Sequence, residues 1–81
     1  MFELYIKENC AYSSAVMHAI EELGMKIKTR NVANNRYAIE LIERGGKFQV
    51  PALYDSEEGT MTYESGAIMD YLDERYEKDA K

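Results

Sequence analysis

Cys10 is the residue with the clearest potential for chemistry, and it is the single cysteine among the 81 residues. It follows a predicted strand and precedes a predicted helix, so its sulfur should lie near the unpaired N–H groups and positive dipole end of that helix. Lys7, three residues earlier, adds a positive charge. A buried, unreactive thiol is the commonest fate of a free cysteine, but a loop between a strand and a helix usually lies at the surface. We therefore predict an exposed thiol with a pKa below its ordinary value of about 8.5.

The elements that position Cys10 follow from the order of the hydrophobic periodicities. Apolar residues alternate over residues 2–6, which predicts a strand, and they take helical spacing over residues 11–23, with Gly24 as the closing residue. A second strand over residues 27–32 carries charged alternate positions, which are typical of a sheet edge. A helix from Asn34 or Asn35 to residue 44, a hairpin of residues 52–54 and 60–63, and a helix from residue 66 to about 76 complete the chain.

Each predicted helix has an apolar face that should be buried. These faces comprise Tyr12, Val16, Ala19, Ile20 and Leu23 in the first helix, Ala38, Leu41 and Ile42 in the second, and Ile68, Tyr71 and Leu72 in the last. Ser65 is suited to cap the last helix. Residues 77–81 are expected to fray.

The order of these elements predicts the fold class. A βαβ unit makes a parallel pair with a right-handed crossover, and the hairpin adds two antiparallel strands. We predict an α/β fold of order βαβαββα, with a mixed four-stranded sheet flanked by three helices that lie on both of its faces. Residues 1–78 form a single domain in this interpretation, and residues 79–81 form a short tail.

Composition excludes several classes of function. Fifteen acidic and ten basic residues give a net charge of −5 and a pI near 4.8, which disfavours binding to nucleic acid. No apolar run approaches the roughly 20 residues that cross a bilayer, so we expect no membrane partner. A single cysteine can form neither an internal disulfide nor a cysteine-rich zinc site, and it fits a reducing compartment. We therefore expect a cytoplasmic protein without a bound metal.

Three segments of the chain resemble proteins of one superfamily. Residues 7–13, Lys-Glu-Asn-Cys-Ala-Tyr-Ser, resemble the glutaredoxin active-site segment Lys-x-x-Cys-Pro-Tyr-Cys, with Ala11 in place of proline and Ser13 in place of the second cysteine. Val50 and Pro51 resemble the valine and cis-proline that face the cysteine in thioredoxin-like proteins. Residues 63–68 resemble the Glu-Ser-x-Ala-Ile segment of the glutathione-transferase N-terminal domain. Together these matches imply a thioredoxin-like fold of the glutaredoxin type.

The resemblance also implies a glutathione-binding site. Ser65 would offer N–H and hydroxyl donors to the γ-glutamyl carboxylate, although helix capping alone also explains a serine there, and Glu64 would face the ammonium group. Val50 would pair its backbone with that of the ligand's cysteine in strand fashion, beside a cis peptide bond to Pro51. Candidates for the glycine carboxylate are Lys7, Lys47 and Gln49. Tyr12 would flank the groove unless it packs under the first helix.

The absence of a second cysteine from these 81 residues leaves only monothiol chemistry to Cys10. The expected function is a glutathione-dependent thiol-disulfide oxidoreductase whose partners are glutathione and glutathionylated proteins or small disulfides. One alternative is an iron–sulfur cluster carrier, which Ala11 and Tyr12 disfavour because monothiol glutaredoxins have Gly-Phe there. The other is a non-catalytic glutathione-binding module.

Two further expectations concern the state of the protein. Glutathione transferases carry an all-helical second domain, and the chain ends where that domain would begin, so a full transferase is not expected. We expect a monomer or a weak dimer.

Overall fold

The computed structural model describes residues 2–79 of the chain. Its elements are β1 (Phe2–Ile6), α1 (Ala11–Leu23), β2 (Lys28–Asn31), α2 (Asn35–Gly45), β3 (Ala52–Asp55), β4 (Thr60–Tyr63) and α3 (Ser65–Asp79). The strands form one sheet in the order β2-β1-β3-β4, in which β1 and β2 are parallel and the other neighbours are antiparallel. The predicted order of elements, the mixed sheet and the edge position of β2 are confirmed.

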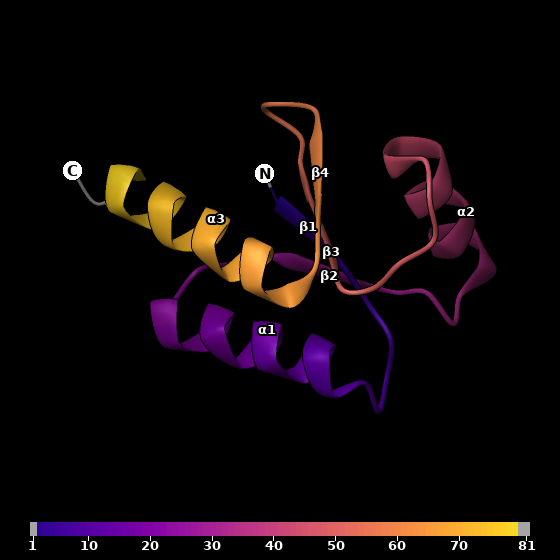
Figure 1. The fold of residues 1–81 in the computed structure, drawn as a ribbon, viewed down its shortest axis with the longest axis horizontal. Coiled ribbons are helices and arrows are strands. Elements are labelled where there is room, and N and C mark those ends of the chain that lie inside the picture. The colour runs from indigo at the N-terminus through magenta and orange to yellow at the C-terminus, as the bar shows by residue number, and fades with distance from the viewer. Residues whose placement is uncertain (1, 80–81) are drawn as a thin grey trace.

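The three helices divide between the two faces of the sheet. α1 and α3 lie side by side on one face, and α2 lies on the other (Figure 1). Alternate residues of β1 serve the two faces: Leu4 and Tyr5 are both fully buried, but they belong to different clusters. Leu4 packs with Val16, Ile20, Leu53, Ile68 and Leu72. Tyr5 packs with Val32, Leu41 and Ala52.

Local sequence signals end α1 and begin α2 where they were predicted to do so. Gly24 has a left-handed backbone, with φ 70°, and it closes α1. This conformation favours glycine because the residue has no Cβ. Asn34 caps α2, since its side-chain oxygen accepts a hydrogen bond from the backbone N–H of Arg36 at 3.0 Å. Asn34 is therefore the capping residue, and Asn35 is the first residue of the helix.

Two side chains that were predicted to be buried are exposed. Tyr12 is 67% exposed and Ile42 is 46% exposed. The buried residues of α1 are Ser13, Val16 and Ile20, so Tyr12 lies beside the buried face of the helix and not on it. In α2, Leu41 is the fully buried apolar residue, and polar contacts from Glu40 and Arg44 occupy part of the interface with the sheet. Ile42 remains outside that interface.

The last helix is longer than predicted. α3 runs from Ser65 to Asp79, so the predicted start at residue 66 and the fraying from residue 77 are wrong. After Gly66 the sequence contains no glycine or proline, which are the usual signals that end a helix. The rest of the predicted fraying segment, residues 80–81, lies outside the described residues.

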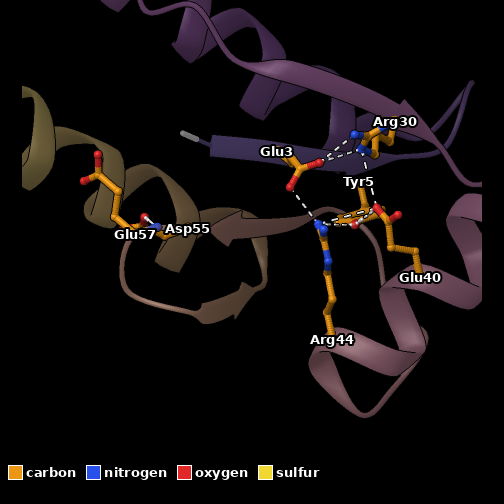
Figure 2. Close-up of polar contacts among 7 residues, drawn as sticks. All are labelled: Glu3, Tyr5, Arg30, Glu40, Arg44, Asp55 and Glu57. Carbon is orange, nitrogen blue, oxygen red and sulfur yellow. Dashed lines mark hydrogen bonds and ion pairs between the residues drawn. The ribbon is translucent and has the colours of Figure 1, made fainter.

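A cluster of polar side chains lies between α2 and the sheet, and we call it the Glu3 network (Glu3, Tyr5, Arg30, Glu40 and Arg44; Figure 2). Glu3 is 8% exposed and accepts hydrogen bonds from Arg30 at 2.8 Å and from Arg44 at 2.6 Å. Arg44 also donates to the Tyr5 hydroxyl at 3.0 Å, and this hydroxyl donates to Glu40. The network joins the C-terminal half of α2 to the strand at the centre of the sheet.

Candidate functional site

The register of the sheet brings three distant segments of the chain to one end. Tyr5 of β1 pairs with Ala52 of β3, and Ala52 pairs with Tyr63 of β4. The residues that leave β1, that enter β3 and that leave β4 therefore emerge side by side. These residues include Cys10, Val50 and Pro51, and Glu64 and Ser65. Every residue in the predicted site belongs to one of these segments or to the first turn of α1.

A pocket of about 400 Å³ lies where these segments meet, and we call it the groove. It is lined by Tyr12, Gln49, Val50, Pro51, Glu64, Ser65 and Gly66. Six of these seven residues were predicted as glutathione contacts, and Gly66 was not. Larger hollows lie between α3 and the β3–β4 turn and between α1 and β2. Neither of them includes a residue predicted for the site, so the groove is the candidate site among these three pockets.

The wall of the groove before β3 has the backbone arrangement that was predicted. The Val50–Pro51 peptide bond is cis, which confirms the prediction. Pro51 is buried and has no N–H, and the pairing of β3 with β4 begins at the next residue, Ala52. Val50 therefore lies beyond the sheet ladder, and it lines the groove.

Cys10 lies at the N-terminus of α1, two residues before the groove residue Tyr12. Asn9 takes a left-handed backbone with φ 58°, a conformation that asparagine tolerates better than most residues. Cys10 follows in the N-cap position with an extended backbone, and its carbonyl accepts a hydrogen bond from the N–H of Ser14 at 3.0 Å. The thiol is partly exposed. Cys10 and Lys7 are not among the residues that line the groove.

The start of α1 lowers the pKa of the Cys10 thiol below its ordinary value, in the direction that was predicted. The backbone N–H and then the hydroxyl of Ser13 have the largest effects, because both stabilise the thiolate. The N–H of Tyr12 and the charge of Lys7 contribute less, and together these groups outweigh the opposing effect of desolvation. The prediction named the helix N-terminus first and the charge of Lys7 as an addition to it, and the contributions follow that order.

Ser13 is a site residue whose role the sequence interpretation missed. The side chain is 2% exposed, and its oxygen accepts the backbone N–H of Lys7 at 3.4 Å. It therefore links the end of β1 to the first turn of α1 beside the thiol. One signal was available in the sequence: Ser13 stands three residues after the N-cap, where a helical N–H points back toward the capping side chain.

The second wall of the groove is formed where β4 ends and α3 begins. Glu64 has a left-handed backbone with φ 72°, which is uncommon for a residue other than glycine and often occurs at functional sites. Its carbonyl accepts the first hydrogen bond of α3, from the N–H of Ile68 at 3.0 Å. Glu64 thus holds the position that was predicted for Ser65, and Ser65 is the first residue of the helix. The N–H groups of the first turn of α3 have no acceptor within the helix, so they are available to a carboxylate in the groove.

The candidates for the glycine carboxylate are dispersed. Gln49 lines the groove, whereas Lys7 is exposed at the end of β1. The ammonium group of Lys47 lies over the Tyr63 ring, 4.5 Å from its centroid. The structure therefore places one of the three candidates in the groove itself.

Residues 2–79 contain neither a candidate metal centre nor a candidate membrane-spanning helix. This part of the chain contains no group of three or more His, Cys, Asp or Glu side chains arranged to hold a metal ion. None of its helices combines the length and the apolar character needed to cross a membrane.

One known protein family matches almost the whole chain. Residues 4–80 match the family model described as glutathione S-transferase, N-terminal domain. Among curated protein sequences, none matches the chain at a significant level.

Solved structures of glutathione transferases share the fold. An epsilon-class glutathione S-transferase from the housefly Musca domestica is 22% identical with a TM-score of 0.76, over 94% of this chain and 35% of its own. A delta-class glutathione transferase from Nilaparvata lugens is 26% identical with a TM-score of 0.77, over 94% of this chain and 36% of its own.

A third similar structure was solved with glutathione. It is Ure2p in complex with glutathione, which is 26% identical with a TM-score of 0.77, over 96% of this chain and 37% of its own. The chain thus spans little more than a third of the length of these proteins. The family model, however, covers almost the whole of the chain, and the fold is the thioredoxin-like fold of these structures. The chain belongs to the family of glutathione S-transferase N-terminal domains.

Proposed function

We propose that this domain binds glutathione in the groove and uses the Cys10 thiolate for monothiol exchange. The observation that carries the proposal is the convergence of three separate segments on one pocket: Tyr12, then Gln49 to Pro51, then Glu64 to Gly66. The reactive cysteine stands two residues before the first of them. The complex of Ure2p with glutathione supports the choice of ligand, because Ure2p is 26% identical to this chain over 96% of the chain's length.

Each end of glutathione finds a chemical counterpart in the groove. The γ-glutamyl carboxylate would accept hydrogen bonds from the first turn of α3 at Ser65 and Gly66, where free N–H groups and the helix dipole favour an anion. Glu64 would take the ammonium group of the same residue. The backbone of Val50 would pair with the cysteinyl backbone of the ligand. This arrangement would direct the ligand sulfur toward the N-terminus of α1.

The proposed reaction requires one protein thiolate and two molecules of glutathione. The Cys10 thiolate attacks the glutathione sulfur of a mixed disulfide, forms a Cys10–glutathione disulfide and releases the other thiol as a thiolate. A second glutathione thiolate then attacks the sulfur of the bound glutathione, which yields oxidised glutathione and restores the Cys10 thiolate. The donors at the start of α1 assist this cycle because they stabilise Cys10 both as the attacking and as the departing thiolate. A glutathione-rich cytoplasm would supply the reductant.

Titration with glutathione, followed by backbone amide shifts, tests the binding step. We expect saturable shifts at Tyr12, Gln49, Val50, Glu64, Ser65 and Gly66. Residues of the β3–β4 turn, at the other end of the sheet, should not shift. If the shifts are absent, or if they gather in one of the other hollows, the proposed site is wrong.

Reduction of a glutathionylated peptide tests the chemical step. Cys10→Ser should abolish turnover, and Ser14→Ala, an exposed neighbour of the same helical turn, should leave it unchanged. Ser13→Ala should slow the reaction and raise the midpoint of the pH profile of Cys10 alkylation, because it removes a hydroxyl that stabilises the thiolate. A wild-type alkylation midpoint at the unperturbed value of about 8.5 would contradict an activated thiol.

A second candidate function is a non-catalytic module that binds glutathione. It is favoured by the match to the nitrogen regulation fragment of the yeast prion protein Ure2p, which is 26% identical to this chain. In that case glutathione would produce the expected amide shifts, but the wild-type protein would not reduce the peptide. The two assays together therefore distinguish an enzyme from a binding module.

A further inference from the structure

One wall of the groove directly precedes β3 and the other directly follows β4. Strand pairing between β3 and β4 does not extend into these two segments. Ala52 and Tyr63 form the last pair of the β3–β4 ladder at this end. The ladder cannot continue in the usual way, since the next residue toward the groove is Pro51, which has no N–H. Gln49 and Val50 on one wall and Glu64 and Ser65 on the other need a different connection to keep a constant separation.

Tyr63 provides a connection between the two walls. It is the last residue of β4 and directly precedes Glu64. Its hydroxyl donates a hydrogen bond to the backbone carbonyl of Lys47 at 3.1 Å. Lys47 lies in the loop between α2 and β3, two residues before Gln49. The hydrogen bond thus joins the chain just outside one wall to the chain just outside the other.

The end of α2 is shaped to accept the Tyr63 ring. A Cβ atom at Gly45 would lie 1.8 Å from the Tyr63 hydroxyl oxygen and 2.8 Å from the ring carbon that bears it. Gly45 is the last residue of α2 and does not have a positive φ, so the close approach of Tyr63, and not a special backbone conformation, requires glycine here. A glycine inside a helix costs about 1 kcal/mol relative to alanine.

A third contact joins Lys47 and Tyr63 through their side chains. The Lys47 ammonium group lies 4.5 Å from the centroid of the Tyr63 ring, within the range of a cation–π interaction. Lys47 therefore meets Tyr63 through both its carbonyl oxygen and its side chain. Together, Gly45, Lys47 and Tyr63 form a cluster that we call the Tyr63 brace.

We propose that Tyr63 is a positioning residue that sets the separation of the two walls of the glutathione groove through its contacts with Gly45 and Lys47. The inference rests on the proposed function for the identity of the ligand. The contact itself does not depend on the ligand, and Tyr63 is not among the residues that line the groove. Its effect on binding is therefore indirect, through the placement of Gln49 and Val50 relative to Glu64 and Ser65.

Tyr63→Phe tests the brace, because it removes the hydroxyl and keeps the ring. The loss of one hydrogen bond between neutral groups should raise the dissociation constant for glutathione about three- to tenfold. It should also lower the backbone order parameters of residues 47–50 in the protein without ligand. The alkylation midpoint of Cys10 should not move, since the donors at the start of α1 are unchanged.

Tyr71→Phe is the matched control. Its hydroxyl donates to the buried carboxylate of Asp55, at the other end of the same hairpin. This variant should lower the urea midpoint at least as much as Tyr63→Phe, because a hydrogen bond to a charged acceptor is the stronger one. It should leave the glutathione dissociation constant within about twofold of the wild-type value, a shift smaller than one weak hydrogen bond. Equal weakening of binding in both variants would overturn the proposal, because binding would then follow stability alone.

Gly45→Ala provides a second route to the same contact. The added methyl group should displace the Tyr63 ring and weaken glutathione binding more than Tyr63→Phe does. The effect of Gly45→Ala should be smaller in a Tyr63→Phe background, where the nearest clashing atom is gone, so the two effects should not be additive. Additive effects would contradict a shared contact.

The two proposals can fail separately. If the wild-type protein does not bind glutathione, the proposed function is wrong, and the order parameters of residues 47–50 still decide whether the brace exists. If the wild-type protein binds glutathione but Tyr63→Phe changes neither the order parameters nor the affinity, the brace is wrong and the groove assignment stands.

Discussion

The two faces of the sheet are attached to their helices by different proportions of apolar and polar interactions. The face beneath α1 and α3 is held mainly by an apolar cluster, in which Leu4, Val16, Leu53, Ile68 and Leu72 are 0–1% exposed, and the Tyr71 hydroxyl adds a hydrogen bond to Asp55. The face beneath α2 has a smaller apolar cluster, with the Glu3 network beside it (Figure 2). Apolar burial is non-directional, whereas hydrogen bonds and ion pairs fix distances and angles.

The difference in interactions between the two faces matches the parts of the groove that their helices position. α1 and α3 carry parts of the candidate site at their N-termini, and the large apolar cluster holds both helices against the sheet. α2 leads directly into the loop that contains Gln49 and Val50, so its position decides the position of one groove wall (Figure 1). We infer that the α1–α3 face contributes most of the free energy of unfolding, and that the α2 face contributes most of the precision of the groove.

The largest effect on stability is expected for Leu72→Ala. Leu72 is fully buried in the α1–α3 cluster, and truncation of a buried leucine costs about 2–5 kcal/mol, with the cavity it leaves included. Urea unfolding measures this loss. Glutathione affinity of the folded protein should remain unchanged, because Leu72 does not line the groove. Leu72→Met, which conserves volume, should cost less than about 1.5 kcal/mol.

Glu3→Gln should have the next largest effect. It removes the charged acceptor of two arginines, and the loss of one partner from a buried pair costs about 3–5 kcal/mol. The Arg44 side chain is 31% exposed, so solvent relieves part of this cost, and we expect about 2–3 kcal/mol. Unlike Leu72→Ala, this variant should also change the amide shifts of Gln49 and Val50. If the shifts stay constant, the α2 face does not control the groove.

The pH dependence of Glu3→Gln tests whether the loss of stability comes from the missing negative charge of Glu3. Burial raises the pKa of the Glu3 carboxyl, but hydrogen bonds and charges of Arg30 and Arg44 outweigh burial and hold that pKa below its ordinary value. A lowered native pKa adds stability above the unfolded-state value of about 4.3, and this stability disappears as pH falls through the native pKa. The difference in unfolding free energy between wild type and Glu3→Gln should therefore be largest above pH 5 and shrink below pH 4. Asp55, whose pKa is also lowered, is present in both proteins and does not affect the difference.

Arg44→Lys should have an intermediate effect, because lysine keeps the charge but not the planar group. Arg44 donates to Glu3 and to Tyr5, and it lies over the Tyr54 ring, 4.3 Å from the centroid. A lysine can replace only part of this geometry, so we expect a loss of about 1–2 kcal/mol in urea unfolding. Arg36→Lys, on an exposed turn of the same helix, is the matched control and should be neutral. Equal effects of the two substitutions would show that Arg44 acts only as a surface charge.

Ile42→Ser should have the smallest effect. Ile42 is 46% exposed on α2, and surface substitutions away from specific contacts usually change stability by no more than about 0.5 kcal/mol. Serine and isoleucine also have similar helix propensities. Urea unfolding measures the loss. A loss above about 1.5 kcal/mol would mean that apolar packing on the α2 face extends beyond the cluster of Tyr5, Val32, Leu41 and Ala52.

The elements were predictable because their signals are local. The alternation in residues 2–6, the glycine after α1 and the asparagine before α2 each act within a few residues. The groove residues were predictable because three short segments resemble known ones, and the cis bond before Pro51 was among the properties that the resemblance implied. The exposure of Tyr12 and Ile42 was not predictable in this way. Several faces of a short helix satisfy an apolar spacing, and packing against neighbouring elements selects one of them.

The sequence by itself determined the order of elements and the single thiol among the 81 residues, and its resemblance to known segments indicated six of the seven residues that line the groove. The tertiary structure decided which groups act on these residues. The leading influence of Ser13 on the pKa of Cys10, the left-handed backbone of Glu64 and the burial of Glu3 beneath two arginines are seen only in the structure. The hydrogen bond from Arg44 to Glu3 joins residues 41 positions apart, and that from Tyr63 to Lys47 joins residues 16 apart. Periodicity and capping report only on neighbours along the chain, so contacts at such separations exist only once the helices and the sheet have packed together.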